Sequence, residues 1–185
     1  MHNSLISTNA QKVLNFLIQS PGKQFLANEI EKATRISRAG VNFSLRKLAK
    51  EKLVLREKKA KIYLYSVDYN NPVIKQSKVL KTTMLLQPLV NKLKALSKKI
   101  VLFGSCARGE NIASSDIDIF ILADSSKAIK EKIKKSNLRE KLQPIIRNST
   151  QLIKMEKEES VFIEEIEHGI TLWESKDEFE NLSNV

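Results

Sequence analysis

The segments VLFGSCARG (residues 101–109) and SDIDIFIL (residues 115–122) decide the fold. Each contains a short apolar run of the kind that forms a buried strand. Alternate residues of a strand point to the same face, so Asp116 and Asp118 project together while the isoleucines beside them enter a core. Adjacent carboxylates repel each other, and a hard cation such as Mg²⁺ relieves the repulsion. The second segment therefore predicts a strand that carries a Mg²⁺ site.

The turn Gly104-Ser105 follows the first apolar run. Such a turn can present backbone N–H groups and a hydroxyl to a phosphate. A phosphate-binding turn beside a metal-binding acid pair indicates phosphoryl or nucleotidyl chemistry.

The two motifs together, with their ten-residue interval, resemble the signature of the DNA polymerase β-type nucleotidyltransferase superfamily. The fuller form of both segments resembles the minimal nucleotidyltransferases of prokaryotes, over about residues 86–173. The resemblance implies that Gly104 and Ser105 hold the phosphates of a nucleoside triphosphate, with ATP as the expected donor, and that Arg108 either neutralises phosphate charge or holds the turn. It also implies that Asp116 and Asp118 are the catalytic metal ligands for Mg²⁺, of the two-metal type if the site is active.

One part of the family pattern is missing. Active members place a third carboxylate on the next strand, which we predict at residues 142–147, but this segment reads LQPIIR. Gln143 stands about where the acid is expected, and an amide cannot act as a general base. Three alternatives follow: another group substitutes, the enzyme is slow, or the domain binds nucleotide without transferring it.

The N-terminal half has a different character. Residues 1–100 carry a formal net charge of +15 and residues 101–185 one of −4, which suggests two modules with different partners. Apolar periodicity predicts helices over residues 5–20, 28–33 and 38–52. Strands are expected at 53–56 and 62–66, separated by a charged turn at 57–61. The region 5–66 resembles the winged helix-turn-helix domains of transcription regulators.

That resemblance implies that the third helix enters the major groove of double-stranded DNA and that the hairpin, or wing, touches the backbone. Phe43 and Tyr63 are assigned to the core. The alternative is a winged helix that serves protein contacts or dimerisation. The residues expected to face DNA are Ser37, Arg38, Asn42, Arg46 and Lys47 on the helix, and Lys58, Lys59 and Lys61 on the wing.

The expected fold is therefore α+β: an N-terminal winged helix-turn-helix joined to a small nucleotidyltransferase-type mixed sheet with flanking helices. We expect the DNA-binding domain at residues 1–70, a connecting helix at 71–85, the nucleotidyltransferase domain at 86–175 and an acidic tail at 176–185. A second helix over about 86–98 would carry Pro88 in its first turn, and Lys75, Lys78 and Lys81 would be exposed.

The composition limits the compartment and the class of protein that the functional hypotheses can assume. The single cysteine, Cys106, allows no internal disulfide and fits a reducing cytoplasm, and no apolar run is long enough to span a membrane. The first hypothesis is a Mg²⁺-dependent enzyme that transfers NMP from NTP to an unidentified acceptor. The second is a transcriptional regulator or toxin–antitoxin component whose nucleotidyltransferase domain only binds nucleotide or a partner protein. A homodimer is compatible with either hypothesis.

Overall fold

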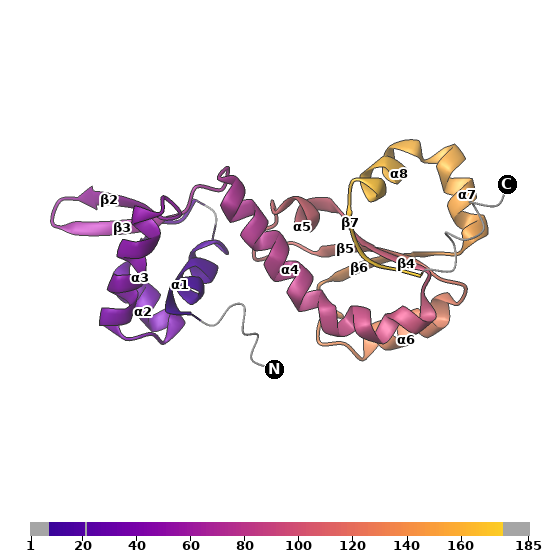
Figure 1. Cartoon of the computed structure of the whole chain (residues 1–185), viewed down its shortest axis with the longest axis horizontal. Helices are drawn as coiled ribbons and strands as arrows, with labels where there is room; N and C mark the ends of the chain where they lie inside the picture. Colours follow the sequence, from indigo (N-terminus) through magenta and orange to yellow (C-terminus); the bar gives the residue numbers. More distant parts are fainter. Residues whose placement is uncertain (1–7, 21, 176–185) are drawn as a thin grey trace. The chain divides into compact units, whose positions relative to one another are not determined.

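The computed structural model describes residues 8–20 and 22–175 (Figure 1). The chain divides into two compact units, Met1–Ser77 and Lys78–Val185. Both contain helices and a β-sheet, so the fold is mixed α+β. The acidic tail expected at 176–185 lies outside the described residues. Within the described ranges, no helix combines the length and the apolar character needed to cross a membrane.

The described part of the first unit contains the helices α1, α2 and α3, the beginning of α4, and a three-stranded antiparallel sheet of order β1-β3-β2. Its helices α1, α2 and α3 pack around one buried core that includes Val13, Ile30 and Leu45. The side chains of Thr8 and Ser37 accept hydrogen bonds from the first turns of α1 and α3, which fixes where those helices begin. The elements are α1 (Asn9–Leu17), β1 (Phe25–Leu26), α2 (Ala27–Thr34), α3 (Arg38–Lys50), β2 (Leu55–Lys59) and β3 (Ile62–Ser66).

The hairpin of this unit differs from the sequence prediction. Leu53 and Val54, expected to begin a strand, instead follow the end of α3 and cap it. Their backbone N–H groups both donate to the carbonyl of Leu48 in the last turn of the helix. The strand β2 therefore starts later and takes up Glu57, Lys58 and Lys59, which were expected in the turn. The prediction of a charged turn over residues 57–61 is wrong: β2 and β3 are joined only by Ala60 and Lys61.

A single helix, α4 (Pro72–Leu93), replaces the two helices predicted on either side of residue 85. Pro88 lies inside this helix, where it removes one backbone donor. The apolar side chains around it, including Leu86, Leu89 and Leu93, are buried in the second unit, and their burial offsets the lost hydrogen bond. A short 3-10 turn, η2 (Lys94–Leu96), follows.

The second unit is built on a four-stranded sheet of order β6-β5-β4-β7. Apolar runs in the sequence predict strands at residues 100–103, 116–122, 142–147 and 170–173, and the structure has a strand at each place, within one residue at each end. They are β4 (Lys99–Leu102), β5 (Ile117–Leu122), β6 (Leu142–Arg147) and β7 (Ile170–Glu174). The pair β5–β6 is parallel, whereas β4 pairs antiparallel with both β5 and β7.

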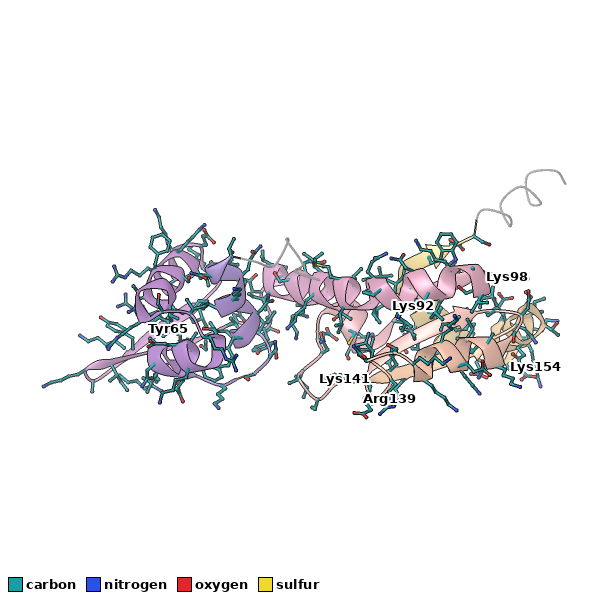
Figure 2. All side chains as sticks on the ribbon, turned by 90° about the horizontal axis from the view of Figure 1, so that it is seen from below. Tyr65, Lys92, Lys98, Arg139, Lys141 and Lys154 are labelled. Atoms are coloured by element: carbon teal, nitrogen blue, oxygen red, sulfur yellow. The ribbon has the colours of Figure 1, made fainter. Side chains whose placement is uncertain are left out.

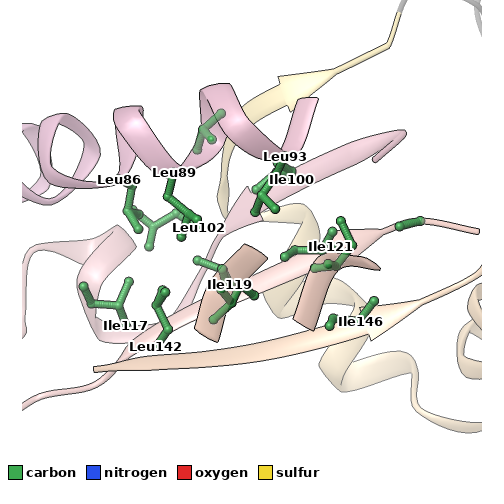
Figure 3. Close-up of a cluster of buried hydrophobic side chains, with 14 of the residues drawn as sticks. Leu86, Leu89, Leu93, Ile100, Leu102, Ile117, Ile119, Ile121, Leu142 and Ile146 are labelled. Carbon is green, nitrogen blue, oxygen red and sulfur yellow. The ribbon is translucent and has the colours of Figure 1, made fainter. Parts of the chain in front are cut away.

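Helices cover both faces of this sheet. On one face, Ile117, Ile119 and Ile121 of β5 pack in one cluster with residues of α4 and α6 (Ser126–Lys134) (Figure 3). On the other face, Phe120 and Leu122 pack against α7 (Ser149–Glu158) and α8 (Ser160–Glu167). Alternation along β5 therefore assigns Asp118 to the face of α8.

The sequence predicts a lysine-rich helix over residues 127–141 and a short helical turn over 149–155, and both predictions have the wrong extent. The first of these helices, α6, ends at Lys134. Its buried positions Ile129 and Ile133 are followed at the next turn by Asn137, which is polar and exposed, so the apolar face does not continue. The short turn expected over 149–155 is the full helix α7, capped by Asn148, whose side chain accepts from the N–H of Gln151.

Candidate active site

The acid pair lies at the start of β5. Ile117 and Ile119 are 5% and 1% exposed, as their assignment to the core requires, while Asp118 between them is half-buried and Asp116 is exposed. The N–H of Phe103 donates to the carbonyl of Asp118 at 3.1 Å. The strand pairing β4–β5 thus brings the residue before the Gly-Ser turn directly beside the second acid.

Gly104 makes the closest approach in the site. It begins α5 (Gly104–Arg108) with a φ of +67°, a backbone conformation that residues other than glycine rarely adopt. A Cβ atom built on Gly104 would lie 2.5 Å from Oδ2 of Asp118. The phosphate turn predicted from the sequence and the acid pair therefore form one contiguous site, and only glycine fits at their junction.

Cys106 stabilises the Gly104-Ser105 turn through a hydrogen bond from its buried side chain. Its side chain is 1% exposed, and its Sγ donates to the carbonyl of Asp116 over 3.3 Å. Burial raises the pKa of the Cys106 thiol, and the charge of Asp118 adds to this effect. The thiol therefore stays protonated and serves as a packing group and hydrogen-bond donor.

The pKa of Asp118 is raised in the folded chain. Burial raises the pKa of Asp118, and the negative charges of Asp116 and Glu165 raise it further, while Arg108 acts in the opposite direction. A cation bound between these oxygens would remove this penalty. The acid pair therefore fits the hard-cation site that its sequence pattern predicts.

Glu165 is a site residue that the sequence did not reveal. It lies on α8, and its Oε1 is 3.1 Å from Nη1 of Arg108, while Nε of Arg108 is 2.9 Å from Oε2 of Glu110. No motif marks this glutamate, because its approach to α5 depends on how the chain returns over the sheet. Arg108, expected at a phosphate, has its guanidinium paired with these two carboxylates.

Gln143, expected from the sequence at about the position of a third acid, lies beside the acid pair. In the parallel pair β5–β6 it is the register partner of Asp118, and its Nε2 donates to Oδ2 of Asp116 at 3.5 Å. Residues 8–20 and 22–175 contain no group of three or more His, Cys, Asp or Glu side chains arranged to hold a metal. The donor set therefore fits a cation with two carboxylates rather than three.

The helix α4 brings positive charge toward the site, which corrects another prediction. Lys78, expected to be exposed, is 4% exposed, and its charge lowers the pKa of Cys106. Lys81 is half-buried, and burial together with the charge of Lys141 lowers its pKa. Lys141, labelled in Figure 2, donates to the carbonyl of Ala113 in the loop that precedes the acids. Lys78 therefore lies near the buried cysteine of the turn, and Lys141 contacts the loop that leads to the acids.

The residues expected to face DNA lie on the first unit. Arg38, Arg46 and Lys47 are exposed on α3, Asn42 is half-buried, and Ser37 is the exposed cap of the helix. On the hairpin, Lys58, Lys59 and Lys61 are exposed; Lys59 Nζ lies 3.5 Å from Glu57 and donates to Gln24 at 3.0 Å.

Two aromatic residues were assigned wrongly. Phe43 is not a core residue: its side chain lies on the outer face of α3 and is 73% exposed. Tyr63 is 38% exposed, and the guanidinium of Arg56 lies 3.6 Å from the centre of its ring. Both had been placed inside because large aromatic side chains are usually buried.

Comparison with known proteins places the second unit in context. The family described as polymerase beta, nucleotidyltransferase matches residues 86–178. A crystal structure of a candidate nucleotidyltransferase from Sulfolobus solfataricus is similar at 14% sequence identity and a TM-score of 0.36, over 56% of this chain and 89% of that one. No curated protein matches the chain. The matched range contains Gly104, both acids and Gln143.

Proposed function

The chain belongs to the polymerase beta nucleotidyltransferase family, and from this premise we propose that it transfers a nucleoside monophosphate from an NTP to an acceptor hydroxyl. The observation that carries the proposal is the contact between Gly104 and Asp118, which joins a phosphate-binding turn to a pair of acids. A nucleotidyl transfer needs these two functions at one place, because the triphosphate must be held where its charge is neutralised.

Each residue has a distinct part in this proposal. Gly104 and Ser105 bind the triphosphate through the turn, and Arg108 can leave Glu110 and Glu165 to pair with phosphate. Asp116 and Asp118 would hold Mg²⁺, and the ion would supply charge stabilisation for the transfer. The raised pKa of Asp118 supports this assignment, because a bound cation would offset the repulsion that raises it.

Label transfer tests the proposal. The purified full chain is incubated with Mg²⁺, cell lysate and each of the four NTPs labelled on the α-phosphate, ATP being the expected donor. We expect label on an acceptor, and its loss in the double variant Asp116→Ala/Asp118→Ala. Asp124→Ala, which removes an exposed aspartate at the far end of β5, is the matched control and should retain transfer. Label transfer that survives in the double variant contradicts the proposal.

A second function has its own support. Gln143 beside Asp118 replaces the carboxylate that would accept the acceptor's proton, so the domain can be a nucleotide-binding platform without transfer. The same experiment separates the two functions when NTP binding is measured in parallel. Binding that depends on Asp116 and Asp118, without transfer of label to any component, would favour the platform.

For the first unit we propose a winged helix that binds double-stranded DNA. The support is the three-helix arrangement with an antiparallel hairpin, the exposed basic residues of α3, and the net charge of +9 over residues 1–77, which hold 14 Lys and Arg against 5 Asp and Glu. The full chain should bind duplex DNA with a steep salt dependence. Arg38→Ala/Arg46→Ala should reduce the slope by about two, whereas Lys127→Ala/Lys130→Ala, an equal charge change on α6, should leave it unchanged.

A further inference from the structure

Phe43 is a large apolar side chain on the exposed face of α3. The residues of α3 that face the core are Val41, Leu45 and Leu48, each 3% exposed or less, whereas Phe43 is 73% exposed. Single exposed apolar residues are common, so exposure alone means little. Its position within the exposed face is what distinguishes it.

The neighbours of Phe43 follow from helix geometry. Residues three and four positions apart share a face, so Ala39 precedes it on that face and Arg46 and Lys47 follow it. All three are exposed. The outer face of α3 thus consists of a small apolar strip, Ala39 and Phe43, directly beside positive charge.

The charge identifies the partner. Burial of Arg46 and Lys47 against an apolar protein surface would carry a desolvation penalty, whereas duplex DNA offers them phosphates. The face therefore suits a polyanion that also presents an apolar group. In the major groove, the apolar group on the base edges is the 5-methyl of thymine, which alanine and phenylalanine side chains contact.

We propose that Phe43, together with Ala39, contacts thymine methyl groups in the major groove and makes α3 prefer sites with thymine at defined positions. This inference rests on the proposed DNA binding of the first unit. It goes beyond it, because phosphate contacts fix position, whereas a methyl contact selects a base. The half-buried Asn42, adjacent in the chain, has the amide group that reads adenine and stands next to the same strip.

The experiment removes the methyl groups. A 40-bp duplex is selected from a random pool by the full chain and is resynthesised with deoxyuridine in place of one thymine at a time. Deoxyuridine keeps base pairing and lacks only the 5-methyl group. At one or two positions, the wild-type chain should bind about fourfold more weakly, as expected for one methyl group that is no longer buried.

The variants Phe43→Ala and Phe43→Leu identify the contact. At the position that Phe43 contacts, Phe43→Ala should bind the thymine and deoxyuridine duplexes equally and keep the wild-type salt slope, while Phe43→Leu should keep part of the discrimination there. Any discrimination due to Ala39, at a second position, should remain. Arg46→Ala should lose salt slope and keep the discrimination. Val161→Ala, which truncates an 80% exposed side chain of the second unit, is the matched control and should behave as wild type.

Each failure is distinguishable. Selection of no duplex at all overturns the DNA-binding proposal and this inference with it. Salt-dependent binding that is insensitive to every deoxyuridine, or equally sensitive in wild type and Phe43→Ala, overturns the inference alone. A change of oligomeric state in Phe43→Ala with unchanged DNA discrimination also overturns it and assigns Phe43 to a protein contact.

Discussion

Gly104 shows how a single residue can couple two functions. Its positive φ sets the direction of the chain after β4, and its lack of a side chain leaves room for the carboxylate of Asp118. A substitution at Gly104 therefore strains the backbone and crowds Asp118 at the same time. At a glycine with open space around it, backbone strain can be measured alone.

We therefore predict different outcomes for Gly104→Ala and Gly22→Ala. Both glycines have a φ near +67°, but a Cβ at Gly22 meets nothing within 4 Å. Each substitution should lower the free energy of unfolding by about 1–2 kcal/mol through backbone strain. Only Gly104→Ala should also displace Asp118 and abolish Mg²⁺-dependent ATP binding. Urea denaturation and calorimetric titration measure the two effects, and normal ATP binding by Gly104→Ala would refute the coupling.

Asp118 yields a prediction with a pH dependence. Its pKa is raised above 3.8 in the folded chain, so the folded state holds this proton more tightly than the unfolded state does. Stability from this group is therefore present below pH 3.8 and is lost as the pH rises through the folded-state pKa. Asp118→Asn should be more resistant to urea than wild type at pH 7, and the difference should shrink toward pH 4.

Asp124→Asn serves as the control for this measurement, because it removes an exposed aspartate that lies beyond the opposite end of β5 from Asp118. An advantage of Asp118→Asn that is absent at pH 7, or constant between pH 4 and 7, would contradict the assigned cause.

The sequence was sufficient to locate Asp116, Asp118 and the Gly-Ser turn, because each belongs to a local motif next to an apolar run. It could not reveal Glu165 or Lys78. Their approach to the site depends on the order of strands and on the path of α4, neither of which a local pattern records. Phe43 was misassigned because its size suggested burial, whereas the periodicity of α3 places it outside.

At the scale of elements, the parallel pair β5–β6 sets what the site contains. Parallel register places Gln143 opposite Asp118, on the same face of the sheet. A substitution at this position therefore acts directly on the acid pair, without any change in the strands.

Gln143→Glu should create the three-carboxylate arrangement typical of active family members. We expect Mg²⁺ to bind about tenfold more tightly, since one more charge at about 4 Å adds on the order of 1 kcal/mol even in water. The pKa of Asp118 should rise further in the metal-free protein. Titration calorimetry with Mg²⁺ measures the effect, and Gln87→Glu on the exposed side of α4 is the control. Unchanged affinity would mean that residue 143 does not reach the ion.

The elements themselves were predictable to different degrees. The four strands of the second unit were found because each is a short apolar run. The hairpin was misplaced because the end of α3 is fixed by hydrogen bonds to Leu48, which outweigh the strand propensity of Leu53 and Val54. The sequence prediction divided α4 between residues 85 and 86, so that Pro88 fell in the first turn of a second helix, where proline is tolerated. In the structure the helix continues through Pro88, and burial of Leu86 and Leu93 offsets the cost of proline in its interior.

At the scale of the whole molecule, each unit has its own hydrophobic core. The residues clustered around Leu45 all belong to the first unit, and those clustered around Ile119 all belong to the second. We predict that Leu45→Ala and Ile119→Ala each lower the stability of one unit by about 2–5 kcal/mol and shift a different transition in scanning calorimetry. A single transition shifted equally by both variants would contradict independent cores.

Cys106 provides a built-in reporter of the turn that it supports. It is the only cysteine in the chain, it is almost fully buried, and its thiol donates a hydrogen bond to the backbone carbonyl of Asp116. Iodoacetamide can reach it only when this part of the protein opens, so the rate of alkylation in native buffer counts those openings. The native cysteine serves as the probe, so no label has to be introduced. If alkylation is slower in the presence of ATP and Mg²⁺, the ratio of the two rates measures how strongly the bound ligand suppresses opening of the turn.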